Sequence, residues 1–254
     1  RVRAADGGAE TVSARLVVGA DGLRSVVVRR LGLLRRAPRL RKLALVAHVR
    51  GLPPMENRGE LRAFAGGCVG VAEVGEGIAN VSVVLAGLEA RRAAGRAEAC
   101  FDETLRRRGL GGAERIDGVL ATGPFDWPVR SAVADGALLV GDAAGYYDPF
   151  TGQGIFRALA GAEAAAEISD AALRRGAATA AALQPYERFR RSQRASVALQ
   201  HLIEAVVARP RLLGAAAARL ALRPPAADTL IRVVGDLAPV RALAHPRLLL
   251  DWIS

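Results

Sequence analysis

Two short apolar runs in the chain each lead into an acidic turn. Residues 138–140 are Leu-Leu-Val and precede Asp142, and residues 16–18 are Leu-Val-Val and precede Asp21. Short apolar runs bounded by glycine are typical of interior strands of a parallel sheet. Ligands of open α/β sheets bind at the carboxyl ends of such strands. Either run alone fits an ordinary turn, but the two together predict a ligand-binding edge that carries both aspartates.

Helices are predicted after both turns. Residues 25–31 follow the first turn, and an alanine-rich segment follows Gly152 and Gly154 after the second. Its small residues Ala158 and Ala162 allow a helix to approach a sheet closely. The unencumbered amides near the two glycines would face an electron-rich group at the positive end of this helix. Asp142 is placed to accept hydrogen bonds from two vicinal hydroxyls of a sugar or ribitol.

The middle of the chain has a different pattern. Short β-type runs are separated by turn residues, and they predict an antiparallel meander. The runs cover residues 43–50, 60–65, 69–74 and 79–85. A helix is predicted over residues 89–108, where apolar residues recur at helical spacing and Gly109 provides a stop. From residue 178 onwards the pattern is helical, rich in arginine and interrupted by prolines.

The two acidic turns carry a family resemblance. Residues 141–155, from Gly-Asp-Ala-Ala to Gly-Gln-Gly-Ile, resemble the second FAD signature of the flavoprotein monooxygenase and geranylgeranyl reductase superfamily, the p-hydroxybenzoate hydroxylase-like flavoproteins. Residues 16–25 resemble the Asp-Gly motif of the same superfamily, and they lie upstream as the family requires. The resemblance implies FAD as the cofactor and NAD(P)H as the electron donor.

The resemblance also implies positions around the cofactor. Asp142 would bind the FAD ribitol, the backbone near Gly154 and Ile155 would meet the flavin pyrimidine edge, and Asp21 would lie near the pyrophosphate. The full set of implied cofactor-binding residues is Asp21, Gly22, Arg24, Gly141, Asp142, Pro149, Gly152, Gln153, Gly154 and Ile155. Candidates for lining the flavin or substrate are His48, Tyr146 and Tyr147, although a structural role is the alternative for His48. No residue is assigned as a catalytic acid or base.

One family element is missing from the sequence. No strand leads into the G-x-G-x-x-G phosphate-binding turn of a dinucleotide fold. The nearest match, residues 75–80, lies between two β-type runs and therefore predicts a hairpin. Residues 1–15 already indicate a strand, a polar turn and a second strand. We therefore expect the chain to be N-terminally incomplete, the later part of a longer flavoprotein or the descendant of one.

The predicted fold class is α/β. An incomplete FAD/NAD(P)-binding Rossmann-like domain would comprise residues 1–34 and 131–177, with the first G-x-G-x-x-G unit absent. A substrate-binding antiparallel sheet domain, residues 35–130, would be inserted between its halves. Residues 178–254 would form a C-terminal helical region. Split domains of this kind suit the family that the motifs resemble.

Composition and charge limit the kinds of partner that the chain is expected to bind. The 254-residue chain is 51% hydrophobic with a net charge of +11, and its apolar tracts are interrupted well before the roughly 20 residues that span a bilayer. A cytoplasmic protein is the default expectation. The basic residues are nearly all arginines spread through the chain, which argues against nucleic acid, although basic C-terminal helices leave peripheral membrane contact open. The two cysteines are too few to predict a disulfide framework or a metal site. The sequence does not predict an oligomeric state.

The reaction type is left between two chemistries. The expected substrate is an apolar small molecule held against the flavin, and the flavin itself carries the redox chemistry. Gln153 in the Gly-Gln-Gly triplet is frequent among monooxygenases, whereas Ala-Ala-Gly at residues 143–145 resembles the geranylgeranyl reductase branch. The sequence slightly favours monooxygenation over reduction of an alkene. A non-catalytic, truncated remnant of such a flavoprotein is the third alternative.

Overall fold

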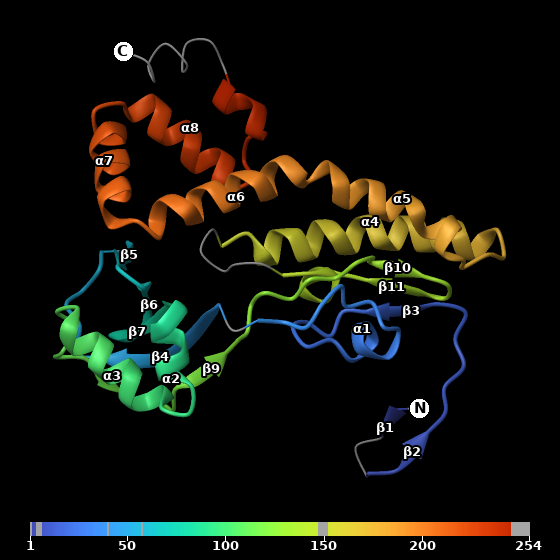
Figure 1. Cartoon of the computed structure of the whole chain (residues 1–254), viewed down its shortest axis with the longest axis horizontal. Helices are drawn as coiled ribbons and strands as arrows, with labels where there is room; N and C mark the ends of the chain where they lie inside the picture. The colour runs from blue at the N-terminus through green and yellow to red at the C-terminus, as the bar shows by residue number, and fades with distance from the viewer. Residues whose placement is uncertain (1, 4–6, 40, 57, 147–151, 245–254) are drawn as a thin grey trace. The chain divides into compact units, whose positions relative to one another are not determined.

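The computed structural model describes residues 2–3, 7–39, 41–56, 58–146 and 152–244. It divides the chain into two compact units (Figure 1). The first unit contains residues 1–36, 128–146 and 152–194, and the second contains residues 37–127 together with the C-terminal part from Ala195. Tyr147 and Pro149, two of the implied site residues, lie outside the described residues.

The sheet of the first unit is built on a parallel pair of strands. Strand β11 (Ala137–Leu139) lies in the middle, with β3 (Val17–Gly19) parallel to it on one side and β10 (Val133–Ala134) antiparallel on the other. All three residues of β11 are buried, as the interior-strand pattern predicts. Strand β3 is at the edge of this sheet, and its two valines are about half exposed. The short strands β1 (Val2–Arg3) and β2 (Ala9–Glu10) pair separately as an antiparallel hairpin.

Three α-helices and one 3-10 helix belong to the first unit. They are α1 (Val26–Arg30), η1 (Gly141–Ala144), α4 (Gly154–Arg174) and α5 (Ala180–Ser192). Helix α5 lies beyond residue 177, where the sequence pattern ends the domain. It belongs to the first unit because Leu183 and Tyr186 are fully buried in that unit's core. The Asp135 carboxylate also accepts a hydrogen bond from the Ala180 amide at the start of α5, over 2.7 Å.

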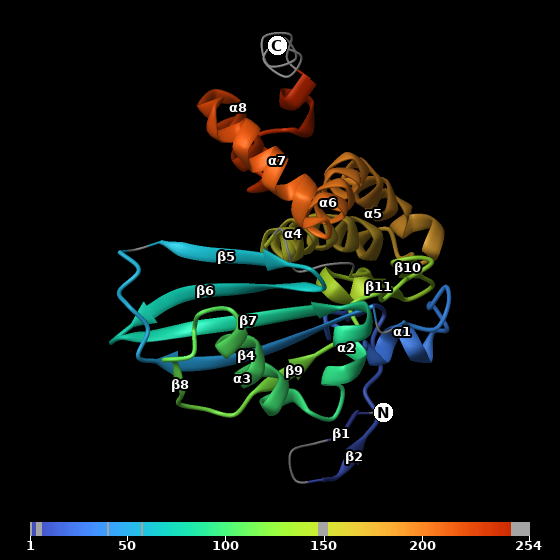
Figure 2. The same cartoon turned by 60° about the vertical axis from the view of Figure 1, so that its left-hand side comes forward.

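The second unit is built on a six-stranded antiparallel sheet, which Figure 2 shows face-on. Its strands are β4 (Lys42–Arg50), β5 (Gly59–Phe64), β6 (Gly67–Gly75), β7 (Ile78–Ala86), β8 (Glu114–Arg115) and β9 (Leu120–Thr122). The order is β5-β6-β7-β4-β8, with β9 also pairing with β4. The predicted meander is therefore correct for β5 to β7 and wrong for β4. That strand pairs with β7, which a local turn pattern cannot reveal.

The Gly-x-Gly segment at residues 75–77 forms the hairpin between β6 and β7. Gly75, Glu76 and Gly77 all have positive φ, at 107°, 53° and 68°. Such angles favour glycine and suit a tight reversal between strands. The segment is thus a strand-to-strand turn, as its flanking pattern predicts.

Two helices cover one face of this sheet instead of the single helix expected over residues 89–108. They are α2 (Gly87–Ala93) and α3 (Ala97–Arg107). The prediction of one helix is wrong because Gly95 has a φ of 78°, outside the helical region, and ends the run. The break lets Ala90 and Ala93 from α2, and Phe101 from α3, bury fully against the sheet.

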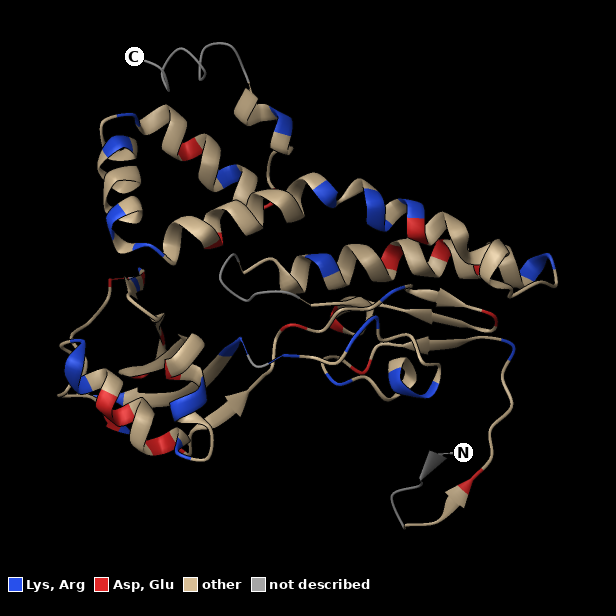
Figure 3. Ribbon diagram, in the orientation of Figure 1, with Lys and Arg blue, Asp and Glu red and all other residues tan. Residues whose placement is uncertain are grey.

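The C-terminal part of the second unit is helical, as the sequence predicts. Its helices are α6 (Arg194–Val207), α7 (Pro210–Ala221), α8 (Pro224–Val234) and η2 (Val240–Ala244). Prolines begin α7 and α8, where the missing amide costs no hydrogen bond. In the described part of the chain, no helix combines the length and the apolar character needed to cross a membrane. Figure 3 shows basic residues distributed over both units, interleaved with acidic ones on α3, α5 and α8.

Candidate functional site

The two acidic turns follow neighbouring parallel strands. Leu139 at the end of β11 lies opposite Gly19 at the end of β3, and the chain continues from there to Asp142 and Asp21. The carboxyl ends of the two strands therefore lie at one edge of the sheet, where ligands of α/β folds bind. The structure thus brings together the two motifs that the sequence singled out.

Gly19 is fixed by packing at this edge. A Cβ atom on Gly19 would lie 2.7 Å from a methyl group of Leu139 and 3.0 Å from the Cβ of Val27. Real Cβ atoms do not approach other atoms so closely, so strand β3, strand β11 and helix α1 meet only because residue 19 has no side chain.

The Gly141-Asp142 turn is equally constrained. Gly141 has a φ of 60°, and a Cβ there would lie 3.3 Å from the Cβ of Ala158 on α4. Glycine is the residue that accommodates both this angle and the close approach of the helix. The predicted role of small residues on α4 is therefore met at Ala158, which packs against the turn.

Asp142 places a carboxylate at this edge of the sheet. Its side chain is half-buried, and this burial raises the pKa of its carboxyl group above the ordinary value. Among the described residues, none donates a hydrogen bond to this carboxylate. A desolvated carboxylate without donors is costly, and a pair of ribitol hydroxyls would supply the missing donors. The geometry therefore fits the ribityl group of FAD at Asp142.

Helix α5 contacts the Asp142 turn through the side chain of Arg190. The Arg190 guanidinium donates to the carbonyl oxygen of Ala144, which belongs to the same 3-10 helix as Asp142. Glu187 accepts a hydrogen bond from the Ala132 amide and pairs with Arg190 at 3.3 Å. No sequence motif pointed to Arg190 or Glu187, because their partners lie about 50 residues away.

Asp21 is engaged in its own turn. Its Oδ2 accepts a hydrogen bond from the Val26 amide over 2.6 Å at the start of α1. Burial alone would raise the pKa of this carboxyl, but hydrogen bonds from Ser25 and from the backbone outweigh it and lower the pKa. Gly22 and Arg24 have positive φ, at 68° and 66°, so the turn is tightly folded. The role implied for Asp21, Gly22 and Arg24 toward the pyrophosphate remains a prediction.

The backbone is open at the two glycines where α4 begins. Gly152 has a φ of 70°, and a Cβ on Gly152 or Gly154 would meet no atom within 4 Å. Ile155 is 78% exposed. Gln153 instead is buried, and its side chain accepts a hydrogen bond from Arg157 over 2.8 Å. The open backbone beside the first turn of a 21-residue helix can accommodate an electron-rich group.

The remaining candidates for lining the flavin or substrate, Tyr146 and His48, lie in different units. Tyr146 follows the Asp142 turn and is half-buried. His48 lies on β4 in the second unit, where its Nδ1 is 2.6 Å from Asp117 Oδ2 and its amide donates to Asp117 Oδ1. These bonds from His48 lower the pKa of the Asp117 carboxyl. They give His48 a structural role in fastening the segment after β8 to β4, and a role in lining the flavin stays a prediction.

Comparison with known proteins supports an FAD-binding fold. Residues 1–108 match the family model described as an FAD binding domain, and the chain aligns with digeranylgeranylglycerophospholipid reductases and with a probable FAD-dependent monooxygenase. The chain is therefore similar to FAD-dependent oxidoreductases. It is 28% identical over 195 residues to a digeranylgeranylglycerophospholipid reductase of Methanoculleus marisnigri, an alignment that covers 74% of this chain and 48% of that protein. The chain spans about half the length of the curated relatives that it matches.

Two solved structures show the same fold. The flavin-dependent halogenase CmlS superimposes with a TM-score of 0.63 at 26% identity, over 73% of this chain and 36% of the halogenase. PqsL of Pseudomonas aeruginosa, a probable FAD-dependent monooxygenase, gives a TM-score of 0.55 at 26% identity, over 79% of this chain and 58% of PqsL. The chain therefore has the mixed α/β fold, with an antiparallel sheet, that the sequence predicts.

Proposed function

We propose that this protein is an FAD-dependent reductase that saturates carbon–carbon double bonds in the isoprenoid part of a small molecule. The observation that carries the proposal is the alignment with digeranylgeranylglycerophospholipid reductases over about three quarters of the chain. The Ala-Ala-Gly sequence at residues 143–145 supports it, because it resembles the reductase branch. We also propose NAD(P)H as the electron donor.

Under this proposal, residues of the first unit bind and orient the cofactor. Reduced FAD would supply a hydride to one alkene carbon, while a proton completes the other carbon. Asp142 would orient the cofactor by accepting hydrogen bonds from its ribityl hydroxyls. Arg190 and Glu187 hold the Asp142 turn in place, and the open backbone near Gly152 and Gly154 leaves room for the flavin ring.

Monooxygenation is the second candidate. The likeness to PqsL and Gln153 in the Gly-Gln-Gly triplet favour it, and the sequence alone placed it slightly ahead. The curated relatives instead favour reduction. The two reactions differ in whether molecular oxygen is consumed, and this difference decides between them.

The deciding experiment is turnover under strict exclusion of oxygen. The full-length protein would be loaded with FAD, reduced with dithionite and mixed with geranylgeraniol. We expect the flavin absorbance to return and the product to be heavier by two hydrogens for each reduced double bond. Product that forms only in air and carries an added oxygen atom would establish monooxygenation. Absence of product under both conditions would support the non-catalytic alternative.

Contact with a membrane surface is a further part of the proposal. Isoprenoid lipids are held in membranes, and the C-terminal helices combine arginines with exposed apolar residues such as Leu212, Leu222 and Ile231. Basic amphipathic helices bind anionic lipid surfaces. Such contact would give the protein access to an apolar substrate at the membrane surface.

A further inference from the structure

The antiparallel sheet of the second unit has two unlike faces. Side chains alternate along each strand, so Leu45, Val69 and Val83 lie on the face that α2 and α3 cover. The opposite face carries Lys42, Ala44 and Val46 of β4 with their partners on β7 and β6. Its side chains are mostly small, and most are only partly buried. This second face has room for something other than protein.

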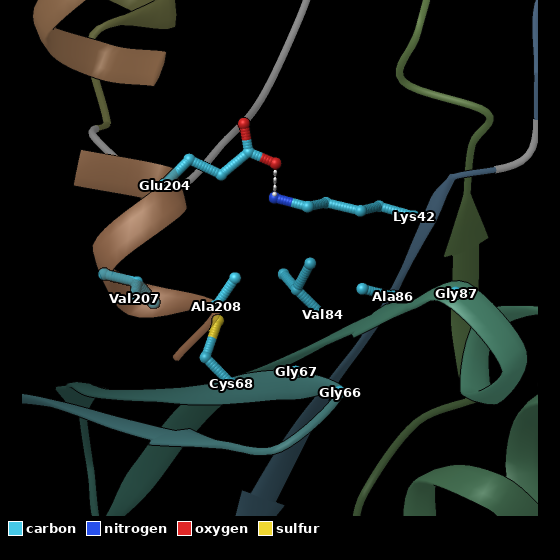
Figure 4. A pocket seen from close by; sticks show the side chains of 10 residues that line it. All are labelled: Lys42, Gly66, Gly67, Cys68, Val84, Ala86, Gly87, Glu204, Val207 and Ala208. Atoms are coloured by element: carbon cyan, nitrogen blue, oxygen red, sulfur yellow. Dashed lines mark ion pairs between the residues drawn. The ribbon is translucent and has the colours of Figure 1, made fainter. Parts of the chain in front are cut away.

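A cavity of about 250 Å³ lies on this second face (Figure 4). Strands β4, β6 and β7 and the residues at their ends form one wall, and the C-terminal end of α6 forms the other. We call it the sheet pocket. The residues that line it are Lys42, Gly66, Gly67, Cys68, Val84, Ala86, Gly87, Glu204, Val207 and Ala208. Apart from one ion pair, its side chains are apolar or small.

Lys42 and Glu204 form that ion pair across the pocket. Lys42 Nζ lies 2.6 Å from Glu204 Oε1, and the two side chains are only 18% and 22% exposed. The opposite charges cancel within the pocket, and separating them in this partly desolvated place would be costly. An anionic ligand would have to break the pair or remain beside an uncompensated Glu204. The charge balance therefore favours an uncharged ligand.

We propose that the sheet pocket binds the hydrocarbon end of an uncharged small molecule and that the Lys42–Glu204 ion pair excludes anions from it. The volume is below the roughly 300–1,000 Å³ of pockets that enclose a whole drug-sized ligand. It therefore holds one end of a longer chain, as an isoprenoid group would provide. In naming the substrate class, this inference rests on the proposed function.

Cys68 provides a direct test because it lines the pocket and is only 6% exposed. The chain has one other cysteine, so Cys100→Ser leaves a single thiol. We expect geraniol and octanol to slow the alkylation of Cys68 by N-ethylmaleimide at least fivefold. Octanoate, which has the same chain length as octanol but a negative charge, should protect far less. Equal protection by octanoate, or none by geraniol, would overturn the proposal.

Variants of the pocket sharpen the test. Glu204→Gln removes the carboxylate that pairs with Lys42 and should allow octanoate to protect Cys68 as well as octanol does. Ala208→Phe should fill the pocket and weaken geraniol protection at least tenfold. Ala205→Phe, three residues earlier and outside the pocket lining, is the matched control and should leave protection unchanged. If both phenylalanine variants behave alike while circular dichroism shows both folded, the assignment of the pocket fails.

The outcome is separable from the proposed function. Protection of Cys68 by geraniol without any alkene reduction would retain the pocket and reject the reductase activity. Alkene reduction that is unaffected by Ala208→Phe, together with unprotected Cys68, would retain the activity and place its substrate elsewhere. Both measurements use the same protein preparation.

Discussion

The backbone amide of Val140 donates a hydrogen bond to the carbonyl oxygen of Gly19 over 2.9 Å. This bond is the last link between β11 and β3 before the two chains diverge into their acidic turns. It joins segments more than a hundred residues apart in the sequence. Asp21 and Asp142 therefore follow strands that end at the same edge of one sheet. All strands of the antiparallel sheet lie between these two residues in the sequence.

Replacing Asp142 by alanine should weaken FAD binding in the full-length protein without unfolding it. A hydrogen bond to a charged group contributes about 1.5–3 kcal/mol, so the loss should raise the Kd at least tenfold. Flavin fluorescence titration measures this change. Asp170→Ala removes an exposed carboxylate on α4 that pairs with Arg174 and should leave the Kd unaltered. An unchanged Kd for Asp142→Ala would contradict the ribitol assignment.

The same site predicts a gain in stability without cofactor. Burial raises the folded-state pKa of Asp142, so this group favours folding while protonated, and that contribution is lost as the pH rises through the raised pKa. Asp142→Asn should therefore unfold at a higher temperature than the unmodified protein at pH 7 in the absence of FAD. The difference should shrink as the pH falls toward 4. Thermal unfolding followed by circular dichroism across this range tests the sign.

Arg190 should act on the cofactor through the Asp142 turn. Arg190→Met removes the donor to the Ala144 carbonyl oxygen and leaves Glu187, which is largely buried, without its cation. We expect faster amide hydrogen exchange over residues 141–146 and a severalfold higher Kd for FAD. Arg174→Met, which breaks an exposed pair on α4, is the control. Weaker FAD binding without a change in exchange at this turn would argue against a positioning role.

Asp21 should stabilise the start of α1 in a pH-dependent way. Its carboxylate accepts the Val26 amide as an N-terminal cap does, and loss of such a cap costs about 0.5–2 kcal/mol. Because hydrogen bonds lower its folded-state pKa below 3.8, the contribution is complete at neutral pH and is lost as the pH falls through that lowered value. Urea unfolding of Asp21→Ala at pH 7 and pH 3 should show a penalty that is smaller at pH 3. A penalty independent of pH would mean that the carboxylate charge is not involved.

Local pattern was enough to find the elements that carry the site. An apolar run that ends in glycine and aspartate predicted β3, β11 and the turns after them, because burial and turn chemistry act over a few residues. Contacts between residues far apart in the sequence could not be predicted, because they leave no local sequence pattern. The place of β4 beside β7, the bond from Arg190 to Ala144 and the Lys42–Glu204 pair all depend on how the chain returns on itself. The split between α2 and α3 was missed because periodicity continues across Gly95 while the backbone does not.

The chain leaves and re-enters the first unit at adjacent points. The Arg35 amide donates to the carbonyl oxygen of Pro128 over 2.9 Å, and Leu34 and Val129 form an antiparallel bridge. Residues 37–127 are therefore an insertion whose ends are already closed, and lengthening a closed loop adds little entropic cost. This insertion can therefore be replaced by another segment during evolution without moving either acidic turn. The antiparallel sheet can consequently change in sequence and size while the strand ends that lead to Asp21 and Asp142 keep their places.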